Sequence, residues 1–432
     1  MYKIIEVNNK KLLKKFVNYP LKLYKDCPYF VPALYSDEMN ALDPKTSVHQ
    51  GEDATVQCFL CVDENEKIVG RACGIISHLY NKKNNDNRMR ISRFDLINDI
   101  EVAKTLLSAV EDWGRKHGVK TIHGPLGFND LEREGLLIEG FDEMCTFESQ
   151  YNYPYYKELL EQLGYVKEVD WIEMQVPIPS QPDERNARLA EAVSKRLKVK
   201  EAQYKNLNDL LKKYYEPIMS LIDETYGILY GTVPITKRVR DSLLGQFKLV
   251  LNKDLISILV DEEDNVVGFG LIFPAINKGV HKAKGRLFPF GWIPVLRSLH
   301  QFETVDFALI GVKPEYQDKG ITSIIFSNLI TRMAKLGVKI AESNLQLEEN
   351  YKIQKLFDVY KPKIVRRRRC YVKSLNGEEI HFAKCVNRKP KEPKSELIEP
   401  KQVELKEPIK KEMKKPVEKE IAESEKITET NE

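Results

Sequence analysis

The chain has 432 residues, and at roughly 100 to 200 residues per domain this length predicts two or three domains. Its 68 Lys and Arg residues nearly balance its 64 Asp and Glu residues, so we expect no nucleic acid partner, because proteins that bind nucleic acid usually carry a large basic excess. No long apolar run and no signal peptide are recognisable, which predicts a cytoplasmic protein. Seven cysteines, an odd number, favour free thiols over a disulfide framework.

Two parts of the chain repeat the same pattern of predicted elements. Each begins with a β-hairpin whose acidic turn lies between two apolar runs, and each continues with a strand and an amphipathic helix. The shared landmarks are the hairpins 58–76 and 256–272, the helices 102–117 and 321–336, the Gly-Val-Lys ends 118–120 and 337–339, and the Asn-Tyr pairs 152–153 and 350–351. This order predicts two homologous α/β domains in tandem, with chance similarity of hairpins as the alternative.

Composition sets the predicted domain boundaries. We expect a first domain at 1–179, a linker at 180–205 that includes part of a Pro-rich polar stretch, and a second domain at 206–387. Residues 388–432 are dominated by Lys, Glu and Pro and contain no aromatic residue, which predicts a disordered tail that serves either as a solubilising extension or as a tether.

The stretch 305–327 has the pattern of an anion site. A predicted strand ends at Pro314, a short polar loop contains one glycine, and an apolar-periodic helix follows. Free N–H groups and the helix dipole at such a helix start favour a phosphate, Gly320 lets the backbone approach it, and Lys319 adds a positive charge. The loop matches neither a P-loop nor a Rossmann fingerprint, and an ordinary strand-to-helix turn is the alternative.

Residues 312–322 resemble the pyrophosphate loop of the GNAT acetyltransferase superfamily, whose pattern is V-x-P-x-x-Q/R-x-x-G-x-G/A; only Thr322 departs from it. The order of elements in both copies resembles that superfamily too, which implies two GNAT-like α/β domains with mixed sheets and an acetyl-CoA or other acyl-CoA cosubstrate. The segments 124–125, 135–142 and 155–156 are similar to bacterial tandem-GNAT proteins associated with ceramide synthases. The residues implied to hold the cosubstrate are Ile310, Val312, Gln317, Asp318, Lys319, Gly320, Ile321, Thr322 and Asn350.

The resemblance also implies an N-acyltransferase in which an amine, from a small molecule or a lipid, attacks the thioester directly. Asp306 stands where the superfamily often carries the carboxylate that deprotonates the amine; an outward-facing strand residue is the alternative. Phe357 replaces the tyrosine that protonates the leaving thiolate, and Tyr360 is the candidate substitute, with water or a core role as alternatives. A non-catalytic acyl-CoA-binding or interaction protein is the competing interpretation.

The first copy lacks the glycine loop and is expected not to hold CoA; its segment 124–156 is either an acceptor-recognition loop or a surface excursion. The run Arg366–Arg369 is predicted to lie on an exposed strand. Cys58 and Cys61 are expected to face opposite sides of a strand, so no metal is predicted. Within the insertion 277–300, residues 282–297 combine cations with aromatic residues, which suits peripheral contact with the inner face of the membrane, an acyl-chain lid or a loop folded onto the core.

Overall fold

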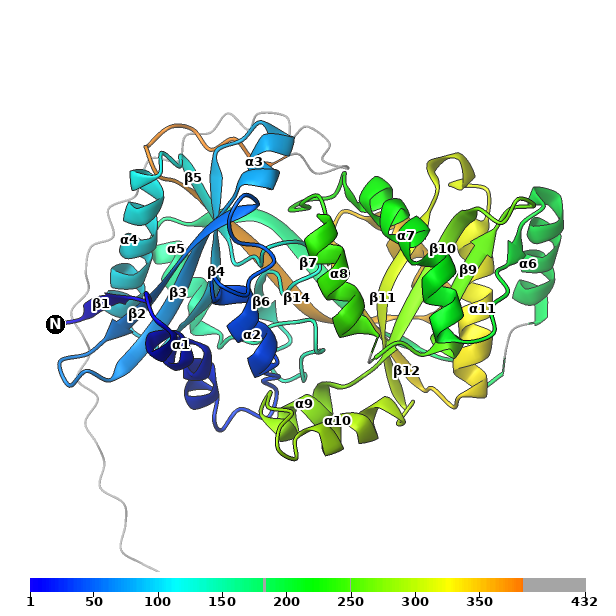
Figure 1. Cartoon of the computed structure of the whole chain (residues 1–432), viewed down its shortest axis with the longest axis horizontal. Coiled ribbons are helices and arrows are strands. Elements are labelled where there is room, and N and C mark those ends of the chain that lie inside the picture. Colours follow the sequence, from blue (N-terminus) through cyan, green and yellow to red (C-terminus); the bar gives the residue numbers. More distant parts are fainter. Residues whose placement is uncertain (182–183, 249, 384–432) are drawn as a thin grey trace, which may run out of the picture. The chain divides into compact units, whose positions relative to one another are not determined.

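A computed structural model of the chain describes residues 1–181, 184–248 and 250–383 (Figure 1). The tail predicted at 388–432 lies outside the described residues. The elements of the first half are, in order, β1 (Lys3–Glu6), α1 (Lys10–Leu23), α2 (Tyr35–Leu42), β2 (Ala54–Val62), β3 (Ile68–Ser77), α3 (His78–Asn84), β4 (Arg88–Leu96), α4 (Ile100–Lys116), β5 (Thr121–Gly124), β6 (Leu136–Glu139), α5 (Tyr155–Gln162) and β7 (Val166–Pro177).

The second half repeats this alternation with longer helices before its hairpin. Its elements are α6 (Glu184–Leu197), β8 (Lys200–Glu201), α7 (Leu207–Tyr226), α8 (Lys237–Phe247), β9 (Ile256–Val260), β10 (Val266–Pro274), α9 (Asn277–Ala283), α10 (Trp292–Leu299), β11 (Thr304–Val312), α11 (Ile321–Lys335), β12 (Ile340–Ser343), β13 (Gln346–Leu347), α12 (Tyr351–Phe357) and β14 (Lys363–Ser374). Short 3₁₀ turns lie at Lys253–Leu255, Pro314–Tyr316 and Asp358–Tyr360.

The internal repeat is confirmed. Strands β2 and β3 form one antiparallel hairpin and β9 and β10 form the other. In each copy the helix that follows the next strand, α4 or α11, packs its apolar side on the sheet and ends before a glycine with positive φ, +73° at Gly118 and +75° at Gly337. Glycine adopts this left-handed conformation without the steric penalty of a Cβ atom, so it ends both helices and redirects the chain into the next strand.

One mixed sheet runs through both halves, because the two copies exchange their last long strands. The strand order is β1-β2-β3-β4-β5-β14-β7-β12-β11-β10-β9-β8. Strand β14, at the end of the second copy, lies between β5 and β7 of the first copy, and β7 in turn pairs with β12 of the second copy. The two copies therefore share one continuous set of backbone hydrogen bonds (Figure 1).

The segment predicted as a linker contains ordered elements. Helix α6 contributes Ala190, Val193 and Leu197 to the hydrophobic core beneath α11, and β8 pairs with β9 at the edge of the sheet. The boundaries 1–179 and 206–387 stay a prediction, since strand exchange joins the copies at the middle of the sheet.

The exposed position predicted for Arg366–Arg369 is wrong. These arginines alternate between faces as expected, but β14 is an interior strand of the sheet. The side chains of Arg366 and Arg368 are fully buried, while those of Arg367 and Arg369 are partly exposed. None of the described helices is long and apolar enough to cross a membrane.

Candidate active site

Strands β11 and β12 separate halfway along β11 and leave part of its edge without a strand partner. They pair in parallel from Thr304–Ile340 to Phe307–Ser343, and β11 then continues to Val312 while the chain after β12 turns into β13, which pairs with β7 instead. The register between β11 and β10 also shifts at this level. An extended ligand could therefore pair with the main chain of residues 308–312.

Tyr226 at the end of α7 contacts the edge of β11 at Ile310. Its hydroxyl oxygen lies 3.0 Å from the Ile310 nitrogen and 3.1 Å from the Ile310 carbonyl oxygen. The Val312 carbonyl accepts a hydrogen bond of 3.1 Å from the Gln317 side chain. The pairing predicted for Ile310 and Val312 stays a prediction, and it requires the Tyr226 hydroxyl to move away from Ile310.

The start of α11 has the features of an anion site. Its N-cap is Gly320, with φ of +99°, no described side chain caps it, and its first turn contains no acidic residue. Lys319 precedes the glycine, and its carbonyl accepts a hydrogen bond of 3.1 Å from Arg196. Ile321 is buried beneath the first turn, whereas Thr322 is partly exposed, and Asp318 is paired with Lys352 at 3.2 Å. The N–H groups of this first turn lie at the positive end of the dipole of a 15-residue helix, so this terminus favours a negatively charged ligand.

The first copy differs from the second at the start of its helix. At the start of α4 the Asp99 carboxylate accepts hydrogen bonds from the Glu101 and Val102 nitrogens, so an acidic side chain already occupies the helix terminus. The edge of β4 does not differ in this way, because the Tyr156 hydroxyl contacts both main-chain polar groups of Leu96, at 2.8 and 3.2 Å, as Tyr226 does at Ile310. A phosphate at the start of α4 would meet the carboxylates of Asp99 and Glu101, which supports the expectation that the first copy does not hold CoA.

Asp306 is buried on β11 opposite Glu342 of β12. Its Oδ1 atom has no hydrogen-bond partner among the described residues. Burial raises its pKa well above the ordinary value, and the nearby carboxylates of Glu342 and Glu148 raise it further. The alternative of an outward-facing Asp306 is therefore excluded, and both burial and the neighbouring carboxylates favour the protonated form of this carboxyl.

Glu148 lies in the loop before α5 and is partly buried. Burial raises its pKa to about 7, and the opposing attraction of Arg133 is too weak to restore the ordinary value. A carboxylate that titrates near neutral pH is suited to accept a proton and release it again. The sequence pattern gave no reason to single out Glu148 or Glu342.

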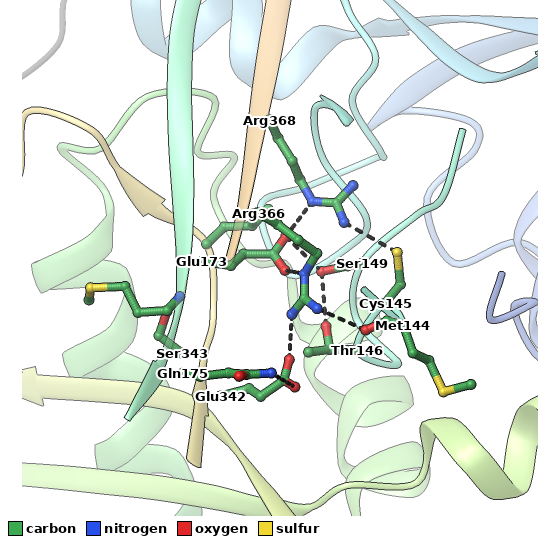
Figure 2. A network of polar contacts seen from close by, with 12 residues as sticks. Met144, Cys145, Thr146, Ser149, Glu173, Gln175, Glu342, Ser343, Arg366 and Arg368 are labelled. Carbon is green, nitrogen blue, oxygen red and sulfur yellow. Dashed lines mark hydrogen bonds and ion pairs between the residues drawn. The ribbon is translucent and has the colours of Figure 1, made fainter. Parts of the chain in front are cut away.

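Beside these carboxylates lies a buried ion network that includes strands β7, β12 and β14 (Figure 2). The two oxygens of Glu173 on β7 accept hydrogen bonds from Arg366 and Arg368 on β14, and Arg366 also pairs with Glu342. The arginines donate further to the main-chain carbonyls of Met144 and Gln150. Burial alone would raise the pKa of Glu173, but the two guanidinium groups outweigh burial and lower it to about 2.

The predicted thiolate donor, Tyr360, packs in hydrophobic clusters that also include Phe307 and Ile310 of β11. Phe357 is a core residue that contacts the rings of Phe307 and Phe326, with ring centroids 5.3 and 5.1 Å apart. Tyr360 ends the 3₁₀ turn that follows, where it is partly buried against the same cluster. Asn350 is the N-cap position of α12 and makes no side-chain cap. The catalytic role of Tyr360 and the binding role of Asn350 stay predictions.

A second buried cluster has metal-ligand chemistry. The side chains of His123, Glu168 and Cys370, on β5, β7 and β14, offer ligand atoms that all lie within 4.8 Å of one another. The Tyr230 hydroxyl lies between them, 2.8 Å from His123 Nδ1, 2.6 Å from the Glu168 carboxylate and 3.2 Å from Cys370 Sγ. These hydrogen bonds connect the loop after α7 to three adjacent strands. Because the Tyr230 oxygen occupies the centre of the group, a cation could enter only by displacing it.

Comparisons with known proteins identify the fold. No protein-family profile matches the chain. It is 27% identical over 376 residues to protein YghO of Escherichia coli, covering 85% of this chain and 94% of the relative. It is 25% identical over 323 residues to a bacterial ceramide synthase of Caulobacter vibrioides, covering 73% and 81%.

Solved structures of similar fold include a tandem GNAT protein from the clavulanic acid biosynthesis pathway, with a TM-score of 0.52 at 9% identity, covering 88% of this chain and 100% of that one. A glucosamine N-acetyltransferase region of a fungal multidomain enzyme has a TM-score of 0.50 at 12% identity, covering 86% and 38%. The predicted tandem GNAT fold is thereby confirmed.

Replacing Glu148 by Gln should stabilise the protein at pH 8 and leave its stability at pH 5 almost unchanged. Folding raises the pKa from 4.5 to about 7, so the folded state binds the proton more tightly and loses stability as the pH rises through that interval. The variant escapes this loss, which amounts to at most about 3 kcal/mol. Urea unfolding at both pH values measures the effect, with Glu143→Gln on the same loop as control. Equal gains at both pH values would contradict the assignment.

Replacing Arg368 by Met should lower the free energy of unfolding by about 3 kcal/mol at pH 7, because it leaves the buried Glu173 charge with one cation fewer. The matched control is Arg367→Met on the same strand, whose ion pairs to Glu139 and Glu348 are more exposed and should cost less than about 1 kcal/mol. Glu173 has a lowered pKa, so its contribution is complete above about pH 4.5 and is lost as the pH falls toward 2. Urea unfolding at pH 7 and pH 3 tests both statements; equal costs for the two arginines would contradict them.

Proposed function

Since the chain has the tandem GNAT fold, we propose that it is an acyl-CoA-dependent N-acyltransferase whose second copy binds the acetyl or longer acyl-CoA. The contrast between the two helix termini carries this proposal. Helix α11 begins at an uncapped glycine beside Lys319, whereas the equivalent α4 begins at Asp99, with Glu101 in its first turn. If only the start of α11 binds a phosphate, only the second copy needs the loop at 313–320, and the start of α4 is free to carry an acidic cap.

We propose that acyl-CoA contacts the second copy in two places, the start of α11 and the edge of β11. The N–H groups of residues 321–323 and the Lys319 side chain would hold its pyrophosphate, and Gln317 lies at the turn between the strand and this loop. The free edge of β11 would take its extended arm once Tyr226 leaves Ile310. Bound there, acyl-CoA supplies a thioester carbon that an amine can attack.

The buried carboxyl groups suit a positively charged acceptor. A protonated amine would place a positive charge beside the carboxyl groups of Asp306, Glu342 and Glu148. Burial raises the pKa values of Asp306 and Glu148 in the free protein, and the positive charge would lower them again. Asp306 can then ionise, and the cluster can take a proton from the amine and leave its lone pair free for attack. The leaving thiolate needs a proton in return, for which Tyr360 remains the proposed donor.

For the acceptor we propose the amine of a long-chain amino alcohol. The similarity to a bacterial ceramide synthase supports this class, because a ceramide is an N-acylated long-chain amino alcohol. The competing proposal, a non-catalytic acyl-CoA-binding protein, is favoured by Phe357 and by the contact of Tyr226 with Ile310. Release of free CoA thiol only when both acyl-CoA and an amine are present would exclude it.

Thr322→Asp should weaken CoA binding at least tenfold, about 1.4 kcal/mol, without lowering thermal stability. A carboxylate in the first turn of α11 repels the pyrophosphate yet interacts favourably with the helix dipole, so the helix itself does not lose stability. Isothermal titration calorimetry with CoA and thermal melting measure the two effects. The control is Glu101→Thr, which exchanges the equivalent residue of the first copy and should leave affinity unchanged. Unchanged affinity in Thr322→Asp would remove the loop from the CoA site.

Asp306→Asn should lower turnover by roughly 10² to 10⁴ while CoA affinity stays within about twofold. Asn keeps the shape of a carboxyl whose raised pKa favours its neutral form, so the melting temperature should hold, and any loss of activity then reports on proton transfer. Thiol release from acyl-CoA is followed with a colorimetric thiol reagent, with Asp241→Asn on α8 as control. Full turnover in Asp306→Asn would remove this carboxylate from the reaction.

A further inference from the structure

The segment between α9 and α10 projects aromatic side chains away from the protein. Phe288 and Phe290 are 83% and 72% exposed and Trp292 is 44% exposed, although such residues are usually buried. The base of the segment is fixed, because Ile276 and Val280 belong to a buried cluster that includes Val31. The exposed rings are therefore held in place at the surface and do not belong to the core, which excludes the expectation of a loop folded onto the core for these rings.

The charges around these rings all have the same sign. Residues 277–300 contain five Lys and Arg residues and no Asp or Glu, although the whole chain is nearly balanced. All five are exposed: Lys278, Lys282, Lys284, Arg286 and Arg297. A random surface of this protein would mix both signs, so this segment is suited to an anionic partner.

Helix α1 extends the same surface. Residues 8–25 contain six lysines and no acidic residue, and all six are exposed. Helical spacing places Lys11, Lys15 and Lys22 on one face together with Asn18. The Asn18 side chain accepts a hydrogen bond of 2.7 Å from Arg286, which joins the lysine face of α1 to the aromatic segment.

We propose that the lysine face of α1 and the segment 278–297 together form a docking surface for an anionic lipid bilayer. Aromatic rings inserted at the headgroup level and lysines paired with lipid phosphates are the two components of interfacial binding. A second copy of the chain does not fit, because a two-fold contact would oppose the cations of one copy with those of the other. An acidic protein would satisfy the charges but would not supply apolar surroundings for the exposed rings.

The surface lies next to the candidate active site. The Asn277 side chain donates to the main-chain carbonyl of Cys145 at 3.1 Å, and residues 144–150 form the wall that contacts Arg366 and Arg368. A lipid acceptor would reach the site from the docked side. Docking itself does not depend on the proposed reaction, so the two can be tested separately.

Cosedimentation of the full chain with phosphatidylcholine vesicles, with and without phosphatidylglycerol, tests the proposal. We expect binding to the anionic vesicles only, falling at least tenfold between about 50 and 500 mM salt. Phe288→Ser with Phe290→Ser, and separately Lys11→Glu with Lys15→Glu and Lys22→Glu, should each reduce binding at least tenfold. Melting temperatures should hold, because all five side chains are exposed.

Matched controls carry the same chemical changes elsewhere. Leu189→Ser with Val166→Ser alters two exposed apolar residues, and Lys104→Glu with Lys116→Glu and Lys157→Glu alters three exposed lysines; both should bind vesicles like the wild type. Equal losses in variants and controls, or no wild-type binding, would overturn the proposal. Retention on an acidic peptide without vesicle binding would assign the surface to a protein partner and also overturn it. Thiol release with a water-soluble amine should be unchanged in every variant, which separates docking from catalysis.

Discussion

The buried ion group of Arg366, Glu173 and Arg368 is the constraint on which the rest of the structure depends. Two guanidinium groups without water require a carboxylate at hydrogen-bond distance, and Glu173 on the neighbouring strand supplies it. This pairing fixes the register between β14 and β7, the two strands that the copies exchange. Separating β14 from β7 would leave Glu173 and the two arginines without their partners. The strand exchange therefore joins the two repeats into one structural unit.

The same group sets the electrostatics of the candidate active site. Arg366 neutralises Glu173 and reaches Glu342, and its attraction for Asp306 is too weak to offset burial. The carboxyl groups of Asp306 and Glu148 consequently have raised pKa values, although the paired charges of Glu173 and Arg366 lie nearby. Such an arrangement attracts a cation with a transferable proton more strongly than a neutral ligand, which is the preference expected for an amine acceptor.

Local patterns in the sequence predicted most of the elements but not the partners of every strand. The hairpins, α4 and α11, and the glycines that follow these helices depend on residues close in the chain, and the structure confirms them. The burial of Arg366 depends on where β14 lies in the sheet, which pairing with residues about 200 positions away decides. Glu148 and Tyr226 carry no local signal, because their environments arise only when distant segments meet. The alternation of side chains between the two faces of a strand is the same in an interior strand and in an exposed one, so it could not show that the arginines of β14 are buried.

The two copies have diverged into complementary roles. In the first, the Asp99 carboxylate caps the helix whose start would otherwise hold a phosphate, whereas in the second the equivalent helix begins at Gly320 with no side-chain cap among the described residues. Yet the first copy supplies Glu173 and Glu148, which lie beside Asp306 of the second copy. Under the proposed function, the capped helix removes a competing phosphate position, and strand exchange lets the first copy serve as one wall of the candidate active site. A single repeat would lack both that wall and the Glu173 carboxylate that pairs with the buried arginines of β14, so the candidate active site depends on residues from both copies.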